Sequence, residues 1–197
     1  MRKIIMKSLE NINDFLRKAK RGPAVITQKD IGDIIAFTGC THDWKVVDAG
    51  SGSGFLSLFL GNLGCKVYTY EKEERFFDIA SANIKKAGFK NVKIKNADIT
   101  KGIKEKDVDL VTLDMKNPER VVGHAFKALK SGGYLVVYSM HIEQIQDLWK
   151  EVQKYEFGKP KILEKLQREW QIEGDTYTRP KTQMLAHTGF LTFIRKI

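Results

Sequence analysis

The sequence predicts an α/β fold: a seven-stranded, mostly parallel sheet with helices on both faces and an antiparallel hairpin at its C-terminal edge. Between residues 45 and 155, five apolar strand-like segments alternate with helical patterns. Strands and helices in strict succession produce a parallel sheet that is covered on both sides. A glycine-rich turn follows the first strand, and extended segments replace the alternation after Gly158. The 197 residues suffice for one domain with a substantial core.

The segment before the sheet is basic and is predicted to be helical. Residues 1–22 contain seven lysine and arginine residues against two acids, which is half of the chain's net charge of +10. The apolar residues that recur there at helical spacing are Leu9, Ile12, Phe15 and Leu16. We therefore expect a basic helical extension over residues 1–22, a single domain over residues 23–197, and a second helix near residues 31–37.

The composition predicts a cytoplasmic protein with an affinity for polyanions. Lysine and arginine number 34 against 24 acids. Such an excess attracts polyanions, of which nucleic acid is the commonest in the cytoplasm, although surface lysine also serves solubility. No apolar run is long enough for a signal peptide or a membrane span, so no membrane partner is expected. Cys40 and Cys65 are isolated thiols without metal-ligand spacing, which predicts core packing and no metal site.

The first strand, near residues 45–48, runs into a turn with glycines at alternate positions. Glycine permits positive φ and lets backbone amides approach a ligand where a Cβ would collide. Dinucleotide-binding turns use the spacing Gly-x-Gly-x-x-Gly, whereas here the glycines are closer together and follow an acid. That acid would repel a pyrophosphate but can accept, directly or through water, from the ammonium group of S-adenosyl-L-methionine, which has no phosphate. The candidate cofactor-binding residues of this turn are Asp48, Gly50, Gly52, Ser53, Gly54 and Phe55.

The second strand, near residues 66–70, ends at Glu71. This acid lies about twenty residues after Gly50, where an acid in this fold type accepts from the two ribose hydroxyls. The alternative is an acid that stabilises the N-terminus of the helix predicted over residues 73–87. Its place at the end of the strand favours the ribose role.

The third strand, near residues 92–95, leads to Asp98. This carboxylate can accept from the exocyclic amine of an adenine while Ala97 and Ile99 pack against the ring. Capping of the next turn is the alternative role.

The fourth strand, near residues 108–113, delivers Asp114 to the same edge. Four successive strands thus end near an acid. Because ligands bind at the carboxyl edge of a doubly wound sheet, these acids predict an acid-lined pocket that suits an adenosyl group and a positive sulfonium.

The remaining elements complete the sheet. A helical pattern near residues 118–129 precedes a fifth strand near 134–139, and another helical pattern covers 142–155. Residues 161–172 and 184–195 are extended and alternating, which predicts an antiparallel pair at the sheet edge. Five parallel strands closed by such a hairpin form the architecture of Rossmann-like class I methyltransferases, whereas a dehydrogenase would carry a second parallel half.

Several short motifs, taken together and in this order, resemble the tRNA (adenine-N1)-methyltransferase family of the T-loop position 57/58 type, especially its archaeal members. They are residues 21–30, Asp48 to Gly54, Tyr70-Glu71, Leu113-Asp114, Pro118 to Val122, Gln144, Arg179-Pro180 and His187 to Phe190. The resemblance runs from about Arg21 to the C-terminus. It implies S-adenosyl-L-methionine at the glycine turn, Glu71 and Asp98, a tRNA substrate, a homotetramer, and Asp114 as the catalytic carboxylate.

The chemistry of methyl transfer to adenine supports a catalytic role for Asp114. Adenine N1 already has an in-plane lone pair, so the enzyme needs only to align it with the methyl group. The base becomes cationic as the methyl arrives, and its amine becomes a stronger donor. A fixed carboxylate that accepts from this amine would therefore bind the transition state better than the substrate. The alternative is a strand-end acid that caps the next helix.

Four residues of the C-terminal third are candidates for RNA contacts, each with a structural alternative. The histidine can equally be satisfied by neighbouring backbone, the arginines can pair with Glu164 and Glu169 across the hairpin, and the glutamine fits a helix N-terminal turn. Trp170 is expected at an interface or in the core rather than in base stacking. The four candidates are Gln144, Arg168, Arg179 and His187.

Two departures from the family pattern leave other functions open. Typical members carry an N-terminal β-domain before the region of Arg21, where this chain has only its basic stretch, and they place a proline-containing loop where this chain has residues 139–142. The first alternative is a small-molecule enzyme resembling the precorrin methyltransferase-decarboxylases, which predicts no RNA binding. The second is a non-catalytic RNA-binding subunit of a methyltransferase complex, which predicts no cofactor binding.

Overall fold

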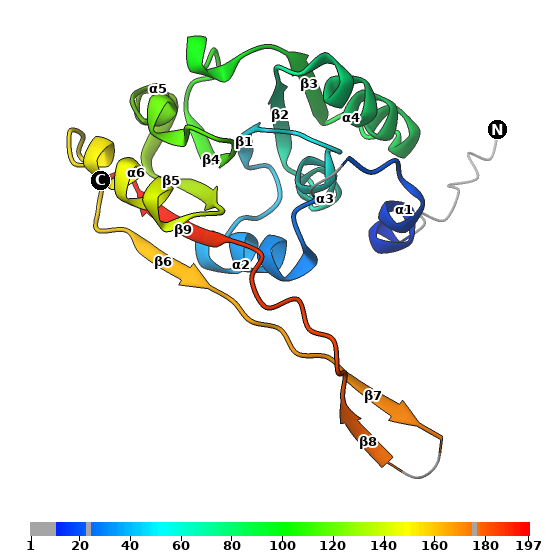
Figure 1. The fold of residues 1–197 in the computed structure, drawn as a ribbon. Helices are drawn as coiled ribbons and strands as arrows, with labels where there is room; N and C mark the ends of the chain where they lie inside the picture. Colours follow the sequence, from blue (N-terminus) through cyan, green and yellow to red (C-terminus); the bar gives the residue numbers. More distant parts are fainter. Residues whose placement is uncertain (1–10, 23–24, 175–176) are drawn as a thin grey trace, which may run out of the picture.

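The computed structural model describes residues 11–22, 25–174 and 177–197 of the chain (Figure 1). Its main sheet has seven strands in the order β3-β2-β1-β4-β5-β9-β6. The five strands from β1 to β5 pair in parallel and β9 and β6 pair antiparallel, as the sequence predicted. The parallel strands are β1 Lys45–Ala49, β2 Lys66–Glu71, β3 Val92–Asn96, β4 Val108–Asp114 and β5 Leu129–Ser139.

Helices separate the parallel strands along the chain. The α-helices are α1 Ile12–Lys18, α2 Gln28–Thr38, α3 Phe55–Asn62, α4 Glu74–Ala87, α5 Val122–Ala128 and α6 Ile142–Val152. Two short 3₁₀ helices, η1 Ile99–Lys101 and η2 Pro118–Val121, lie at the carboxyl edge. The single helix predicted over 118–129 is therefore divided between η2 and α5. Of the predicted N-terminal extension, residues 1–10 lie outside the described residues.

Two apolar clusters cover the two faces of the sheet. One combines α1, α2, α3 and α4 with buried residues such as Val46 and Val67, and the other combines α5 and α6 with residues such as Val47 and Val111. Because successive residues of a strand point to opposite faces, β1 and β4 are apolar on both sides. This double burial explains why these strands read as continuous apolar runs.

The parallel register brings the ends of the strands to one edge. Asp48 of β1 lies opposite Thr112 of β4, and Asp114 lies opposite Tyr138 of β5. The strand order reverses between β1 and β4, since β2 and β3 lie on one side of β1 and the later strands on the other. Ligands bind at such a switch point.

The C-terminal hairpin differs from its prediction. Only β6 Lys161–Glu164 and β9 Phe190–Arg195 join the main sheet, with β9 inserted between β5 and β6. The strands β7 Trp170–Glu173 and β8 Tyr177–Pro180 form a separate two-stranded sheet. This sheet projects from the body of the molecule, and we call it the arm (Figure 1). The alternating pattern identified extended chain correctly, but it carries no information about which strand is its partner.

Cys40 and Cys65 are both buried, and their sulfur atoms lie 3.5 Å apart, in agreement with the predicted core packing. No helix in the described ranges is long and apolar enough to cross a membrane.

Candidate active site at the carboxyl edge of the sheet

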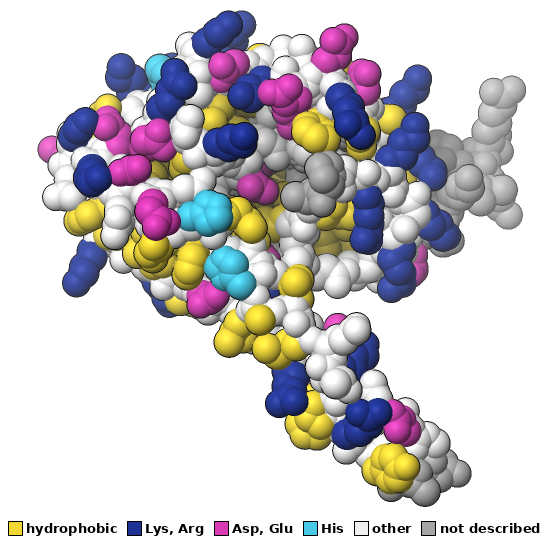
Figure 2. Space-filling view, viewed as in Figure 1, with side chains coloured by type: hydrophobic (Ala, Val, Ile, Leu, Met, Phe, Trp, Pro, Cys, Tyr) yellow, Lys and Arg dark blue, Asp and Glu magenta, His cyan; other side chains and the backbone are white. Residues whose placement is uncertain are grey.

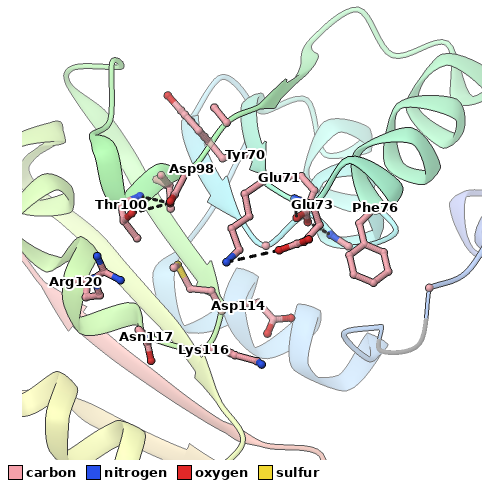
Figure 3. Close-up of a pocket in the computed structure, with 17 residues that line it drawn as sticks. Tyr70, Glu71, Glu73, Phe76, Asp98, Thr100, Asp114, Lys116, Asn117 and Arg120 are labelled. Atoms are coloured by element: carbon pink, nitrogen blue, oxygen red, sulfur yellow. Dashed lines mark hydrogen bonds and ion pairs between the residues drawn. The ribbon is translucent and has the colours of Figure 1, made fainter.

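A cavity of about 400 Å³ opens at the carboxyl edge of the sheet (Figure 3). It is lined by residues at the ends of β2 and β4 and by residues of the segment that follows β3. Three of the predicted acids line it: Glu71, Asp98 and Asp114. A smaller cavity of about 30 Å³ adjoins it and is lined by the fourth acid, Asp48. Both cavities share the residues Gly50, Gly52 and Asp114, so the four acids belong to one site.

The glycine turn is shaped by a close approach of two backbones. Gly50, Gly52 and Gly54 have φ angles of 81°, 53° and 78°. Residues other than glycine rarely adopt this backbone conformation. A Cβ on Gly50 would lie 1.9 Å from the carbonyl oxygen of Asp114. Glycine is therefore required at position 50 because β4 ends directly against the turn.

Asp48 is held by hydroxyl groups from three elements. Its Oδ2 accepts from Ser57 and Thr69, and its Oδ1 accepts from Thr112, each at 2.7 Å. The residue is only 3% exposed, and these bonds stabilise a charge that would otherwise be costly to bury. The sequence did not reveal this network, which fixes the carboxylate beside the smaller cavity.

Glu71 joins the second strand to the glycine turn. Its Oε2 accepts from the backbone N–H of Gly52 and its Oε1 from that of Glu73, both at 3.0 Å. Each carboxylate oxygen has a further lone pair, so Glu71 retains acceptor capacity on the cavity side.

Asp98 combines both roles considered for it. Its Oδ1 caps η1 by accepting from the N–H and the hydroxyl of Thr100, at 2.9 and 2.8 Å. These hydrogen bonds hold the pKa of Asp98 below its usual range because they stabilise the ionised form. Its second oxygen has no partner among the described residues. Ile99 is buried beside it.

Asp114 is the carboxylate with no hydrogen-bond partner for its side chain in the described part of the chain. Its side chain is exposed to solvent at the mouth of the cavity, where the surrounding protein still displaces part of its hydration. This desolvation raises the pKa of Asp114 to about 7, and the negative charges of Asp48 and Glu71 add to the rise. A cationic ligand would lower that pKa again.

Ser53 and Phe55 attach the segment before α2 to the glycine turn. The N–H of Gly22 donates to Ser53 Oγ at 2.6 Å, and the guanidinium of Arg21 lies 5.5 Å from the centre of the Phe55 ring. Gly22 also lines the larger cavity. Residues 21 and 22 therefore form part of the site wall.

The sequence did not single out a buried polar network behind Asp114. Tyr138 lies next to Asp114 in the sheet, its hydroxyl donates to the Thr188 carbonyl, and burial raises its pKa to about 12. Lys29 donates to Thr188 Oγ1 and to Asp30 Oδ1, each at 2.6 Å. The side chains of Lys29 and Asp30 are 6% and 2% exposed, so this is a buried ion pair. Residues 28–30 and 187–190 were both motifs of the resemblance, but only the fold shows their contact.

Gln144 and His187 have structural partners. Gln144 Oε1 accepts from the backbone N–H groups of Met140 and His141, and its Nε2 donates to the carbonyl of Lys116 at 3.0 Å. One ring nitrogen of His187 lies 2.7 Å from Glu164 Oε1, and the hydrogen bond raises the pKa of His187.

Arg179 lies in β8 of the arm and Arg168 lies two residues before β7, and neither lines the cavity. Arg179 pairs with Glu173 at 2.7 Å. The suggested pairing of these arginines with Glu164 and Glu169 is wrong, since Glu164 contacts His187 and Glu169 pairs with Lys181. The hairpin register, which the sequence does not specify, decides these partners. Among the described residues there is no group of three or more side chains arranged to hold a metal ion.

Comparisons with known proteins show which proteins this chain is similar to. The family described as "tRNA methyltransferase complex GCD14 subunit" matches residues 20–178. The tRNA (adenine(57)-N(1)/adenine(58)-N(1))-methyltransferase TrmI of Methanocaldococcus jannaschii is 34% identical over 92% of this chain and 75% of that protein.

Two solved structures are also similar. The tRNA (m1A58) methyltransferase TrmI from Aquifex aeolicus is 29% identical with a TM-score of 0.85, covering 96% of this chain and 76% of that one. A SAM-dependent O-methyltransferase from Thermotoga maritima is 30% identical with a TM-score of 0.87, covering 95% of this chain and 72% of that one. The match over residues 20–178 and the identity to an archaeal relative show that this chain belongs to the tRNA methyltransferase family described by the GCD14 subunit.

Proposed function

We propose that this protein transfers a methyl group from S-adenosyl-L-methionine to N1 of an adenine in tRNA. The observation that carries the proposal is the position of Asp114, a carboxylate without a partner in the described chain, between the two cavities at the switch point. The family, whose relatives are named as tRNA adenine-N1 methyltransferases, supplies the substrate class. Membership of this family favours methyl transfer to tRNA over a small-molecule substrate and over a non-catalytic role.

The residues present fit the cofactor. The larger cavity has the volume of a small-molecule site, and its acidic lining complements a positively charged ligand. S-Adenosyl-L-methionine, when bound, supplies an electrophilic methyl group on a cationic sulfonium. We assign the ribose hydroxyls to Glu71 and the adenine amine to Asp98, with Ile99 against the ring.

The smaller cavity is assigned to the amino-acid part of the cofactor. Asp48 lies there with acceptor capacity for an ammonium group, and Gly50 and Gly52 present backbone without side chains. Ser53 and Phe55 complete its lining. The glycines permit approach, while Asp48 provides the charge that favours the ammonium.

Asp114 would then act on the target base. In the reaction, a bond forms between adenine N1 and the methyl carbon while the bond from carbon to sulfur breaks, and its electron pair stays on sulfur. The base gains positive charge, so its amine donates more strongly. The fixed Asp114 carboxylate accepts that hydrogen bond and therefore binds the transition state more tightly than the substrate.

The test is methyl transfer to unmodified tRNA with labelled cofactor, followed by nucleoside analysis. We expect 1-methyladenosine as the product, and a loss of about 10²–10³-fold in rate for Asp114→Ala with cofactor affinity retained. A methylated nucleoside other than 1-methyladenosine would contradict the assigned base. Equal loss of cofactor binding and rate would make Asp114 a cofactor ligand instead.

We further propose that the protein works in the cytoplasm as a homotetramer assembled through the arm. A two-stranded sheet is marginally stable alone in water, and the arm exposes large apolar side chains (Figure 2). Trp170 is 63% exposed and Ile172 79% exposed. Burial against other copies would stabilise the arm. We retain residues 23–197 as the methyltransferase domain, preceded by a basic extension over residues 1–22.

A further inference from the structure

The rim of the larger cavity carries two cations, one from the loop that follows Asp114 and one from η2. Lys116 and Arg120 both line the cavity and are both exposed, and Figure 3 shows them on the side opposite Glu71 and Phe76. We infer that Lys116 and Arg120 bind backbone phosphates of the RNA next to the target adenosine. The inference rests on the proposed function and names the residues that would hold the RNA at this site.

The charge distribution separates the base from its phosphates. The interior presents the carboxylates of Glu71, Asp98 and Asp114, which favour a cation and repel a phosphate. With the cofactor at Glu71 and Asp98, the target nucleotide would present its base to Asp114 and keep its phosphates outside the cavity. The rim cations lie where such phosphates would remain.

Neither rim cation is engaged elsewhere. Within the described residues, the side chains of Lys116 and Arg120 have no hydrogen-bond or ionic partner, whereas Lys72, the other cation of the lining, pairs with Glu73 at 3.7 Å. The exposed Lys150 of α6 is likewise paired, with Asp147 at 2.8 Å. A phosphate would thus meet two available charges without first breaking an ion pair.

The backbone beneath the rim is fixed. The carbonyl of Lys116 accepts from Gln144 of α6, Pro118 is buried at the start of η2, and the N–H of Arg120 donates to the carbonyl of Asn117 at 3.3 Å. Two long side chains on a fixed backbone can adjust to phosphates while keeping their position relative to Asp114. Gln144 then acts on the substrate only through Lys116, as a positioning residue.

The experiment measures tRNA binding by the full-length chain over a range of KCl concentrations. The double variant Lys116→Gln/Arg120→Gln is compared with Lys150→Gln/Lys154→Gln, which removes the same charge from ion-paired, exposed lysines in α6 and just after its end. Each phosphate contact contributes about one unit to the slope of log Kd against log salt. We expect the rim variant to reduce that slope by about two and to weaken binding about tenfold per contact at low salt. The Lys150→Gln/Lys154→Gln variant should match the parent.

Cofactor affinity, measured by calorimetry on the same proteins, separates the possible results. Unchanged affinity for S-adenosyl-L-methionine with a reduced salt slope supports the inference and shows that the variant is folded. An unchanged slope overturns it. A cofactor affinity that falls together with RNA binding also overturns it, because the cations would then hold the cofactor's carboxylate. If the parent protein itself neither binds nor methylates tRNA, the proposed function fails, which is a different result from an unaltered rim variant.

Discussion

At the scale of single residues, the four carboxylates of the site differ in the hydrogen bonds that they accept. Asp48 accepts three hydroxyl hydrogen bonds and Glu71 accepts two backbone N–H bonds. Asp98 is stabilised by Thr100, which keeps its pKa low. Asp114 has no such support, and its pKa is raised to about 7. One carboxylate is thus able to change its protonation state near neutral pH while the site retains its acidic character.

The raised pKa predicts the pH dependence of the reaction. Since the proposed role requires the ionised form, kcat/KM for methyl transfer should rise with pH and level off above about 7. The inflection in kcat should lie lower, because the cationic cofactor favours the carboxylate. In Asp114→Asn, the rise of kcat/KM with pH should be lost. Steady-state rates from pH 5 to 9 test this prediction, and a parent profile that stays flat over this range would contradict the proposed role of Asp114.

The raised pKa of Asp114 also makes the stability of the protein depend on pH. The direction follows from comparing the folded with the unfolded chain. Unfolded Asp114 ionises near its ordinary pKa of 3.8, whereas the folded group resists ionisation up to about 7. Ionisation therefore favours the unfolded state over this interval, and the cost to folding grows from pH 4 to pH 7. The Tm of Asp114→Asn should rise relative to the parent across this window and stay constantly higher above it. A Tm difference that is independent of pH would show that Asp114 titrates normally.

At the scale of elements, the junction between the glycine turn and β4 carries most of the geometric constraint. Gly50 combines a φ of 81° with a backbone contact that leaves no room for a Cβ. Gly88 provides a matched comparison, since its φ is 74° but no atom lies within 4 Å of a Cβ built there. The two glycines differ in crowding and not in backbone conformation.

We expect Gly50→Ala to be more damaging than Gly88→Ala. Both substitutions incur the left-handed backbone cost of about 1–2 kcal/mol. Only Gly50→Ala must also displace the end of β4, which adds about 1–3 kcal/mol of overpacking and moves Asp114. Denaturant unfolding measures the loss of stability, and the rate of methyl transfer reports the displacement of Asp114. Equal effects of the two variants would mean that the turn is free to move away from β4.

At the scale of the whole molecule, the body and the arm differ in how they use apolar residues. The body buries its apolar side chains in two clusters on either side of the sheet. The arm presents Trp170 and Ile172 to solvent, and the register places them on one face of a two-stranded sheet. Figure 2 shows apolar side chains along the arm and charges of both signs over the body. This contrast is the basis of the proposed assembly.

The arm provides the prediction for the whole molecule. Trp170→Ser/Ile172→Ser should shift the protein to smaller assemblies, because each large apolar side chain contributes about 1.5–3 kcal/mol on burial. Ile142→Ser/Trp149→Ser, which replaces exposed apolar residues of α6, is the matched control and should leave the assembly unchanged. Light scattering after size-exclusion chromatography reports the mass. A monomeric parent protein, or an arm variant of unchanged mass, would contradict assembly through the arm.

The sequence by itself determined the parallel α/β sheet and the position of the site at its edge. Local patterns suffice for this: strands buried on both faces read as apolar runs, and an acid at the end of each parallel strand must lie at the same edge. Glu71, Asp98 and Asp114 were thus predicted to lie at one edge, and the structure places them around one cavity. The motif order also identified the family.

Only the tertiary structure decided which groups each acid meets. Three hydrogen bonds join segments that are far apart along the chain. Thr112 donates to Asp48, Lys29 donates to Thr188, and Gln144 donates to the carbonyl of Lys116. The arm was decided in the same way, since an alternating pattern predicts extended chain but not its partner strand. The raised pKa of Asp114 has the same origin. Desolvation and the charges of Asp48 and Glu71 act through space, and no local pattern encodes those distances.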